Sequence, residues 1–548
     1  MKKNLLTILS LAAMASVQGQ TLVDNLTLNS YSNQTSIQAL KSVTLTNGFY
    51  IPAPAAGKSV TISIAGFQTL VSRPSADQNY IVTRTFRSPG VTLSTLNAQR
   101  TIGDENQTIQ YFDGLGRPSQ TIQLMASPTY KDIVQYIEYD GFGRESTKFL
   151  PHVKNQAGDG SFKPTAKSDQ QAYYATTNTW DPAVVKTANP YSVTVFENSP
   201  LNRVKEQGAP GAAWQPLPAA GTGHTVKTDY GTNTATGPDV VRLWTVTASG
   251  ASGTTNYGAG KLYRTTTRDE NTVNTTDRSG SVDEYKDFEG RVVLKRVWES
   301  ESKALNTYYV YDDFGDLRYV VPPAVTADSF NELAADPNFD KYIYAYKYDG
   351  RRRLIKKKIP GRGWDYLVYN KNDQVVFTRD AEQLKREEWT FTKYDAFGRV
   401  VMTGIEKGHV GDNHDDLQQA LSDFTGPMWE ERGTVLEGYT NNTIPQNKDN
   451  MTVLQVNYYD DYTFTGATTL PVNGVTKSTK IKSLQTGSKI YRTDGTQPLL
   501  TVLYYDDYGR VIQTASKNHL GGTDYVTNTY NFAGDLLTST RVHTPVTG

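Results

Sequence analysis

The sequence predicts an all-β protein built from repeated strand–turn–strand units, with a small β module before them and two short helices inserted among them. Three observations carry this prediction. A hexapeptide with the pattern aromatic-Asp-x-x-Gly-Arg recurs along the chain, and several of its copies start 21 to 27 residues apart. Short runs rich in Val, Ile, Thr and Tyr flank the copies, and the chain holds 35 Tyr and 44 Gly. Such spacing is typical of stacked supersecondary units, and the flanking composition favours strands.

The copies differ in how closely they follow the pattern. The clearest are FDGLGR, YDGFGR, YDAFGR and YDDYGR, which begin at residues 112, 139, 394 and 505. Weaker ones are KDFEGR, YDDFGD, YDGRRR, YNKNDQ and YNFAGD, which begin at residues 286, 311, 348, 369 and 530. Steps of 27, 25, 21, 25 and 25 residues separate the starts at 112 and 139, 286 and 311, 348 and 369, 369 and 394, and 505 and 530.

Each hexapeptide is predicted to be a hairpin turn. Asp at the start of a type I turn hydrogen-bonds the backbone two residues on, and Gly closes the turn in the left-handed conformation. Replacing Gly398 or Gly509 by Ala should therefore cost about 1 to 2 kcal/mol. The predicted turn residues are Asp113, Gly116, Arg117, Asp140, Gly143, Arg144, Asp287, Gly290, Arg291, Asp312, Gly315, Asp395, Gly398, Arg399, Asp506, Gly509 and Arg510.

One copy breaks the rule. In YDGRRR, Arg352 stands where the four clearest copies have Gly. The turn should therefore either shift onto Gly350 or hold Arg352 in a strained conformation.

Length, charge and cysteine content exclude several classes of protein. A chain of 548 residues is too long for one compact core, but an array of units packed on their neighbours reaches this size. Lys and Arg number 56, as do Asp and Glu, so no overall field points to nucleic acid or to an anionic membrane. Because the chain has no Cys, it has neither a disulfide framework nor a thiol for lipid attachment.

Residues 1–19 are predicted to be a secretory signal peptide. Lys2 and Lys3 precede an apolar stretch from Leu5 to about Val17, and small or permissive residues follow, with cleavage expected after Gly19. A membrane anchor is the weaker interpretation, since the apolar stretch is short for a span. The mature protein should be secreted or held at the cell surface.

The rest of the chain divides into segments of different sequence character. Residues 20–76 lack the hexapeptide and indicate a small separate β module with a turn at Asn47-Gly48 and another at Ala56-Gly57. After the copy at residue 139 the spacing is lost for over a hundred residues, and Val195–Val204 (VFENSPLNRV) is interpreted there as a stretched copy. Residues 207–223, rich in Gly, Pro and Ala, favour a loop.

Two helices are predicted where the spacing between copies lengthens. One covers about Asp328–Ala335, with a capping-box spacing from Ser329 to Glu332, and should be stopped by Pro337. The other covers about Asp415–Phe424 and begins with helix-favouring acids. Both are interpreted as loop insertions on the repeat scaffold.

A candidate metal cluster precedes the second helix. Imidazole and carboxylate are suitable metal ligands, but their spacing here matches no standard zinc motif. A polar loop leading into a helix explains the pattern better. The cluster consists of His409, Asp412, His414, Asp415 and Asp416. No metal or other cofactor is expected.

A basic run and the repeated aspartates are further candidates for a functional site. Arg351–Lys358 could bind an anionic polymer, but a solvated strand pair after a turn explains it better, and no nucleic-acid partner is expected. Repeated carboxylates could suggest a glycosidase, yet a catalytic pair is needed once, whereas these recur in one local context. No nucleophile elbow, phosphate loop or H-E-x-x-H motif occurs. The chain is predicted not to be an enzyme.

The copies YDGFGR, YDAFGR and YDDYGR resemble the YD repeats of the bacterial Rhs family. The resemblance assigns residues 226–548 to a YD-repeat array and residues 77–225 to an uncharacterised domain that commonly precedes such arrays in secreted members. It implies a β-sheet spiral that forms a shell, and many members enclose a C-terminal toxin. The chain departs from the family near its end, where the closing core is missing. Its two Asp-Pro pairs, at Asp181 and Asp336, lack the Gly expected of the family's self-cleavage motif.

Two functions remain open after the sequence is read. The first is an exported shell portion of a polymorphic-toxin-type protein, with a toxin cargo as partner, in a chain that has lost its core and toxin or is an incomplete reading frame. The second is a cell-surface adhesion or carbohydrate-binding protein whose partners are glycans or other cells. Neither involves catalysis.

Overall fold

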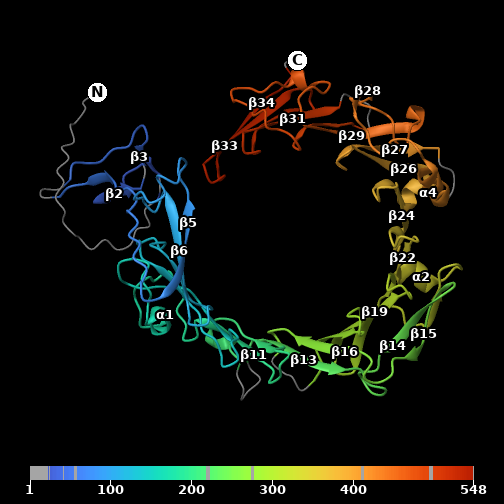
Figure 1. Cartoon of the computed structure of the whole chain (residues 1–548), viewed down its shortest axis with the longest axis horizontal. Coiled ribbons are helices and arrows are strands. Elements are labelled where there is room, and N and C mark those ends of the chain that lie inside the picture. The colour runs from blue at the N-terminus through green and yellow to red at the C-terminus, as the bar shows by residue number, and fades with distance from the viewer. Residues whose placement is uncertain are drawn as a thin grey trace. The chain divides into compact units, whose positions relative to one another are not determined.

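The computed structural model describes residues 23, 25–40, 42–54, 58–216, 223–272, 277–408, 413–492 and 498–546. These residues confirm the prediction of an all-β protein, with a few short helices between the strands. The chain forms two compact units. The first extends to Lys227 and takes in a short segment that begins at Asp269, and the second holds the rest. Figure 1 labels the elements along the chain. The predicted signal peptide lies outside the described residues.

The first unit begins with two small parallel strand pairs, β1 with β3 and β2 with β4. A five-stranded antiparallel sheet in the order β10-β8-β7-β6-β5 follows, and β9 pairs with β11, which pairs with β12. The bounds are β1 Asn25–Leu28, β2 Ser36–Ala39, β3 Ser42–Leu45, β4 Thr61–Ile64, β5 Asn79–Phe86, β6 Glu105–Phe112, β7 Pro118–Gln123, β8 Ile133–Tyr136, β9 Thr147–Phe149, β10 His152–Val153, α1 Ala166–Tyr174, β11 Tyr191–Phe196 and β12 Val204–Gln207.

The second unit is a long antiparallel ladder in which strands pair in chain order from β16 to β34, with a separate three-stranded sheet β14-β15-β21. Its first elements are β13 Val226–Thr232, β14 Arg242–Thr247, β15 Gly250–Asn256, β16 Tyr263–Arg268, β17 Val282–Lys286, β18 Val292–Ser300, β19 Lys303–Tyr311, β20 Leu317–Val321, β21 Ser329–Asn331, α2 Pro337–Tyr342, β22 Tyr344–Tyr348 and β23 Leu354–Ile359. The remainder are β24 Gly363–Tyr369, β25 Val375–Arg379, α3 Ala381–Lys385, β26 Glu388–Tyr394, β27 Val400–Lys407, α4 His414–Asp423, β28 Arg432–Leu436, β29 Met451–Tyr459, β30 Gln485–Ile490, β31 Leu499–Tyr505, β32 Val511–Lys517, β33 Thr523–Tyr530 and β34 Leu536–Thr544.

Strand alternation builds the largest apolar core of the second unit. In β26, burial alternates with the period of two expected of a strand, and Trp389 and Phe391 are fully buried. Val368, Phe377 and Val456 from neighbouring strands belong to the same cluster. Trp389 is thus a packing residue of this core.

One predicted helix is wrong. The residues predicted as a helix around Asp328–Ala335 contain the short strand β21, which pairs with β15, and this pairing outweighs the local helix-capping pattern. The helix α2 begins only at Pro337, and proline is tolerated in the first turn of a helix. Asp336 caps this helix, since its side chain accepts hydrogen bonds from the Asn338 and Phe339 amides. Proline therefore starts a helix where it was expected to stop one.

The other predicted helix is confirmed as α4 (His414–Asp423). The helices α1 and α3 were not predicted, although α3 carries a complete capping box between Asp380 and Gln383. In the described part of the chain, none of the helices has the length and apolar character needed to cross a membrane.

A buried ion pair lies inside the second unit. Lys393 on β26 donates from Nζ to Glu430 Oε1 at 2.9 Å, and both side chains are fully buried. Glu430 also accepts hydrogen bonds from the amide of Thr443 and the hydroxyl of Thr440. Burial by itself would raise the pKa of Glu430, but Lys393 and these donors lower it from 4.5 to about 2.

We predict that Glu430→Gln lowers the free energy of unfolding by about 3 to 5 kcal/mol, because Lys393 would remain buried without its counter-ion. The depressed pKa of Glu430 contributes stability that is present above pH 4.5 and is lost as the pH falls towards 2. The wild-type protein should lose this contribution over that window, whereas the Gln variant should not. Local hydrogen exchange in β26 across this pH range measures both effects.

Glu382→Gln on α3 is the matched control, since the Glu382 side chain is exposed. It should change neither the stability of β26 nor its dependence on pH. Equal behaviour of the two variants would contradict a structural role for the buried pair.

Candidate functional site: the repeated turn and its contacts between copies

The copy FDGLGR shows the geometry of the repeated turn. The Asp113 amide donates to the Arg117 carbonyl at 2.8 Å, and the Gly116 amide donates to the Asp113 carbonyl at 3.0 Å. Oδ1 of Asp113 accepts from the amides of Leu115 and Arg117, and Oδ2 accepts from Arg117 Nε at 2.8 Å. These hydrogen bonds, that from the Arg117 amide first, lower the pKa of Asp113. The carboxylate is thus fully used in closing the turn.

The other predicted copies have the same turn. In each copy with Asp at position two, that residue accepts from the amides of positions four and six, and the amide of position five donates back to its carbonyl. Asn370 makes the same contacts in copy 369–374, and Asn531 in copy 530–535 accepts from the amide of position six. The position-two aspartates are Asp113, Asp140, Asp287, Asp312, Asp349, Asp395 and Asp506. The glycines at position five have φ angles of 75° to 94°, and they are Gly116, Gly143, Gly290, Gly315, Gly398, Gly509 and Gly534.

The arginine at position six pairs with the aspartate of its own turn. Nε to Oδ2 distances are 2.6 to 2.8 Å. The arginines concerned are Arg117, Arg144, Arg291, Arg353, Arg399 and Arg510. Every predicted turn residue therefore lies within a hairpin turn.

The unusual copy YDGRRR does not shift its turn onto Gly350. Arg352 occupies position five with a φ of 64°, and its amide donates to the Asp349 carbonyl. A non-glycine residue in this left-handed region costs free energy unless its surroundings compensate. The compensation is a contact with the preceding copy.

Tyrosine at position one joins each turn to the hairpin before it. The Tyr394 hydroxyl donates to the Val375 carbonyl at 2.7 Å, and Val375 is the strand residue paired with the tyrosine of the preceding copy, Tyr369. The same hydrogen bond recurs from Tyr139, Tyr311, Tyr348, Tyr369, Tyr505 and Tyr530. Tyr459, the last residue of β29, makes it too, although it begins none of the predicted copies. Burial raises the pKa of Tyr394, so its hydroxyl remains a donor.

The arginine at position six makes the second contact between copies. The Arg117 guanidinium lies 4.3 Å from the ring centroid of Tyr139, the first residue of the next copy. Arg291, Arg353, Arg399 and Arg510 stack in the same way on the tyrosine that follows each of them, at 4.3 to 5.3 Å. Each of these five rings, those of Tyr139, Tyr311, Tyr369, Tyr459 and Tyr530, is therefore held by a hydroxyl contact and by a cation on its face.

Charges at positions six and five match between successive copies. Copy 311–316 ends in Asp316 rather than Arg, and Nη2 of Arg352 at position five of the next copy lies 2.6 Å from Asp316 Oδ1. Copy 348–353 in turn ends in Arg353. Arg353 Nη1 lies 2.8 Å from Asp373 Oδ1, at position five of copy 369–374. Asp373 also has a positive φ of 60°. Where glycine is lost from position five, its replacement bears the charge opposite to the preceding position six.

Glycine at position five also leaves room for the preceding copy. A Cβ built on Gly315 would lie 2.9 Å from Arg291 Nη1, and one on Gly143 would lie 3.2 Å from Arg117 Nη1. The glycine thus serves the turn's own backbone and the approach of the neighbouring arginine.

Other turns of this kind carry weaker sequence signals. Asn518 accepts from the amides of Leu520 and Gly522, and the Gly521 amide donates to the Asn518 carbonyl. Its signal is Asn three residues before Gly, without an aromatic residue at position one. The stretched copy in VFENSPLNRV keeps a two-point ion pair between Glu197 and Arg203, at 2.6 and 2.8 Å, across a longer loop.

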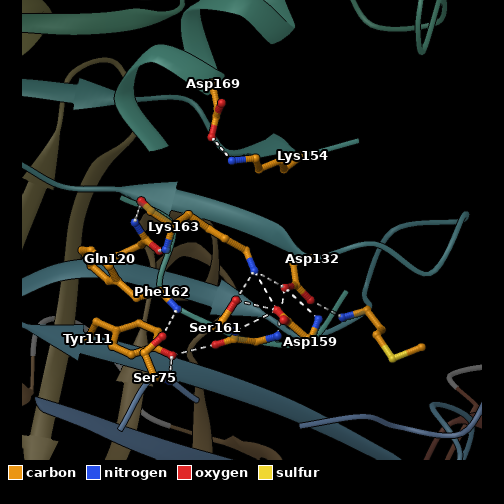
Figure 2. A network of polar contacts seen from close by, with 12 residues as sticks. Ser75, Tyr111, Gln120, Asp132, Lys154, Asp159, Ser161, Phe162, Lys163 and Asp169 are labelled. Carbon is orange, nitrogen blue, oxygen red and sulfur yellow. Dashed lines mark hydrogen bonds and ion pairs between the residues drawn. The ribbon is translucent and has the colours of Figure 1, made fainter. Parts of the chain in front are cut away.

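The first unit contains a separate buried polar network (Figure 2). Lys163 Nζ contacts Asp132 Oδ2 at 3.0 Å, Asp159 Oδ1 at 2.9 Å and Ser161 Oγ at 3.0 Å, and Lys163 and Asp132 are both 2% exposed. The Lys163 backbone exchanges two hydrogen bonds with the Gln120 side chain on β7. Burial would raise the pKa of Asp159, but Lys163 and Ser161 outweigh it and lower that pKa. All three donor positions of the ammonium are occupied.

A second layer of this network reaches β6. The Tyr111 hydroxyl donates to the Gly160 carbonyl at 2.7 Å and accepts from the Ser75 amide, and Ser75 Oγ accepts from the Phe162 amide (Figure 2). A Cβ on Gly160 would lie 2.3 Å from Ile109 Cδ1. The network therefore fastens the segment around Gly160 and Lys163 onto the five-stranded sheet.

Comparison with known proteins finds one domain match over part of the chain and distant structural likenesses. Residues 82–232 match a domain of unknown function, DUF6443. No curated protein matches the chain. The crystal structure of TcdB2-TccC3 is similar at 13% identity and a TM-score of 0.35, over 81% of this chain and 20% of that one. The Tc holotoxin pore of Photorhabdus luminescens, with mutated TccC3, gives 12% and 0.35, over 80% and 22%. The chain thus spans about a fifth of these chains.

The remaining sequence candidates have structural partners. Nδ1 of His414 lies 2.7 Å from Asp415 Oδ1, and Nε2 lies 2.9 Å from the Leu367 carbonyl. His409 and Asp412 of the candidate metal cluster lie outside the described residues. Within the described ranges, no group of three or more His, Cys, Asp or Glu side chains could hold a metal ion.

The basic run Arg351–Lys358 is not simply a solvated strand pair. Its three arginines pair with Asp316, Asp349 and Asp373 in the turns. Lys358 is buried, which lowers its pKa, and its Nζ donates to three carbonyls around the end of α2. Most of the positive charge that the sequence displays is therefore used within the fold.

We predict that exchanging the charges of Asp316 and Arg352 restores what either single change removes. Asp316→Arg and Arg352→Asp each set like charges against one another and should cost about 1 kcal/mol in local opening. The double variant recreates the order found at Arg353 and Asp373, and Asp also tolerates the positive φ better than Arg. Hydrogen exchange of the two turns measures the coupling.

The exposed pair Glu382 and Lys385 on α3 provides the control, since both side chains are about two-thirds exposed. Exchange of these two charges should give a coupling near zero. Additive effects at Asp316 and Arg352 would show that the charge match between copies does not stabilise the ladder.

Proposed function

We propose that this chain is an exported, non-catalytic β scaffold of the Rhs type, and that it forms the N-terminal shell portion of a polymorphic-toxin-type protein. The observation that carries this proposal is the coupling of successive turns. The most distinctive polar residues of the chain, the Asp, Arg and Tyr of the hexapeptide, contact one another or the neighbouring hairpin. A catalytic centre needs such groups directed at a substrate. In this chain the Asp, Arg and Tyr side chains of each copy instead contact the protein itself, as expected of a scaffold in which one sheet is extended by repeated hairpins.

The residues that match DUF6443 fit the same proposal. They contain the first two hexapeptide copies and the buried network around Lys163. An ammonium with three acceptors lacks the free lone pair and open side that a general base or Schiff-base lysine requires. We therefore assign this network to the stability of the first unit.

Export is tested by producing the full chain in a bacterial host and sequencing the N-terminus of the protein recovered outside the cytoplasm. The proposal predicts removal of residues 1–19, because the basic start and apolar stretch direct export. Leu9→Arg should abolish both export and cleavage, since it places a charge in that stretch. A chain that stays in the cytoplasm and begins at Met1 would contradict export.

The toxin association is tested by reading the genomic DNA around this reading frame. An in-frame continuation with a closing core and a variable tail, followed by a small immunity-type gene, supports the shell. A stop without any of these genes nearby would refute it.

A surface-adhesion function is the second candidate, favoured by one pocket of the second unit. It has a volume of about 590 Å³ beside β14, and Trp244, Tyr257 and Tyr309 line it among seven charged side chains, Arg242 and Asp313 included. Aromatic rings can pack against the apolar face of a ligand, and charged groups beside them can hydrogen-bond its polar atoms. Binding of the full chain on a glycan array, lost in Tyr309→Ala, would favour adhesion over the shell.

A further inference from the structure

The buried pair of Lys393 and Glu430 has a third member, the side-chain amide of Asn441. Lys393 Nζ lies 2.8 Å from Asn441 Oδ1, 2.9 Å from Glu430 Oε1 and 2.9 Å from the Thr443 carbonyl. The side chains of Lys393 and Glu430 are fully buried. An amine, a carboxamide and a carboxylate therefore meet at a place from which water is excluded.

The amide carbon of Asn441 lies close to the lysine nitrogen. A C=O bond is about 1.2 Å long, so Asn441 Cγ lies within about 4 Å of Lys393 Nζ. Atoms poised to react in enzymes stand about 3 to 3.5 Å apart, which a movement of about 1 Å would reach here. Asn441 Nδ2 donates to the Gln446 carbonyl at 2.7 Å, and this bond keeps the carbonyl side of the amide towards Lys393.

The surroundings of Lys393 favour a reactive amine. Burial lowers the pKa of Lys393, so its ammonium gives up a proton more readily than an exposed one. Glu430 Oε1 lies at hydrogen-bond distance to accept that proton. Rotation about the Cε–Nζ bond then directs the nitrogen lone pair at the amide carbon. Lys163 in the first unit differs, because the three acceptors of its Nζ are two carboxylates and a hydroxyl rather than a carboxamide.

We propose that Lys393 and Asn441 join in an intramolecular isopeptide bond. Nζ bonds to Cγ, the Cγ–Nδ2 bond breaks, and its electron pair leaves with Nδ2. Of the three Nζ protons one passes to Nδ2, which departs as ammonia, one passes to Glu430, and one remains on the new amide. An ammonium, a carboxamide and a carboxylate thus become an amide, ammonia and a neutral carboxyl group. Ammonia leaves past Gln446, which is exposed.

The ion pair of Lys393 and Glu430, with its dependence on pH, is the state that precedes this bond. The low pKa of Glu430, about 2, makes it a weak base, so the reaction is slow. One event in the lifetime of each folded chain is sufficient, because the product is not turned over. Exclusion of water also protects the new amide from hydrolysis.

The bond ties β26 to the segment that leads from β28 to β29. Its two residues are 48 positions apart in the chain. The same segment already contacts β26 through the Glu430 amide, which donates to the Tyr394 carbonyl at 2.7 Å. A covalent link across a loop of this length restricts the unfolded chain, as a disulfide does, in a protein that has no Cys. The bond requires neither export nor a toxin.

Peptide mapping of the full chain tests the proposal. Folded protein is incubated until its peptide map no longer changes, then denatured and digested with trypsin, which does not cleave after an acylated lysine. We expect residues 387–399 to stay uncut at Lys393 and to be joined to residues 433–448, with a mass lower than their sum by one ammonia. Asn441→Ala should abolish the joined peptide. Glu430→Gln should slow its formation at least about a hundredfold, the range of a lost proton acceptor.

Asn442→Ala is the matched control, because it removes the same atoms from the next residue of the same tryptic peptide and should leave the link intact. Wild-type protein kept in denaturant should form no link, since the three groups then no longer meet. Absence of the joined peptide from folded wild-type protein would overturn the proposal. So would a link from Lys393 to Glu430, which releases water, or a loss of ammonia confined to one peptide, as in a succinimide.

Discussion

The hydrogen bond from each copy's tyrosine hydroxyl to the preceding hairpin is the contact on which the ladder depends. Local chemistry explains why each hexapeptide turns, but a turn alone does not fix the position of its hairpin beside the next. The hydroxyl of Tyr394 does so, because it reaches one carbonyl only, that of Val375. A shift of one residue along the strand would direct the side chains to the opposite face and lose this bond. The arginine stacked on the next ring reinforces the same register.

The charge match between positions six and five explains the irregular copies. Arg352 and Asp373 would be unfavourable in left-handed backbone if each turn stood alone. Each faces an opposite charge from the copy before it. The chain thus tolerates the loss of glycine where the neighbour compensates, which is the behaviour of a quasi-one-dimensional array whose units are stabilised by nearest-neighbour contacts.

The all-β fold and the turns of the hexapeptide copies could be predicted from the sequence because both rest on local signals, strand propensity and the Asp-x-x-Gly pattern, whereas the turn at Asn518 lacks the aromatic residue that marks the copies. Contacts between copies could not, because they depend on which strands pair. The same limit explains the wrong prediction of a helix at about Asp328–Ala335. The sequence around Glu332 fits a capped helix locally, but the pairing of β21 with β15 decides its structure. The network of Lys163, Asp132 and Asp159 has no sequence motif, since its members come together only when distant segments pack.

Hydrogen exchange in the variant Tyr394→Phe tests the central claim most directly. Loss of the hydroxyl leaves the Val375 carbonyl without its donor, at a cost of about 1 kcal/mol. Faster exchange is predicted in β24 and β25 of the preceding hairpin as well as in β26 and β27. Tyr508→Phe, in an exposed turn position, should change neither hairpin. Exchange that increases only within residues 388–407, and not in the preceding hairpin, would contradict the claim that tyrosine couples successive copies.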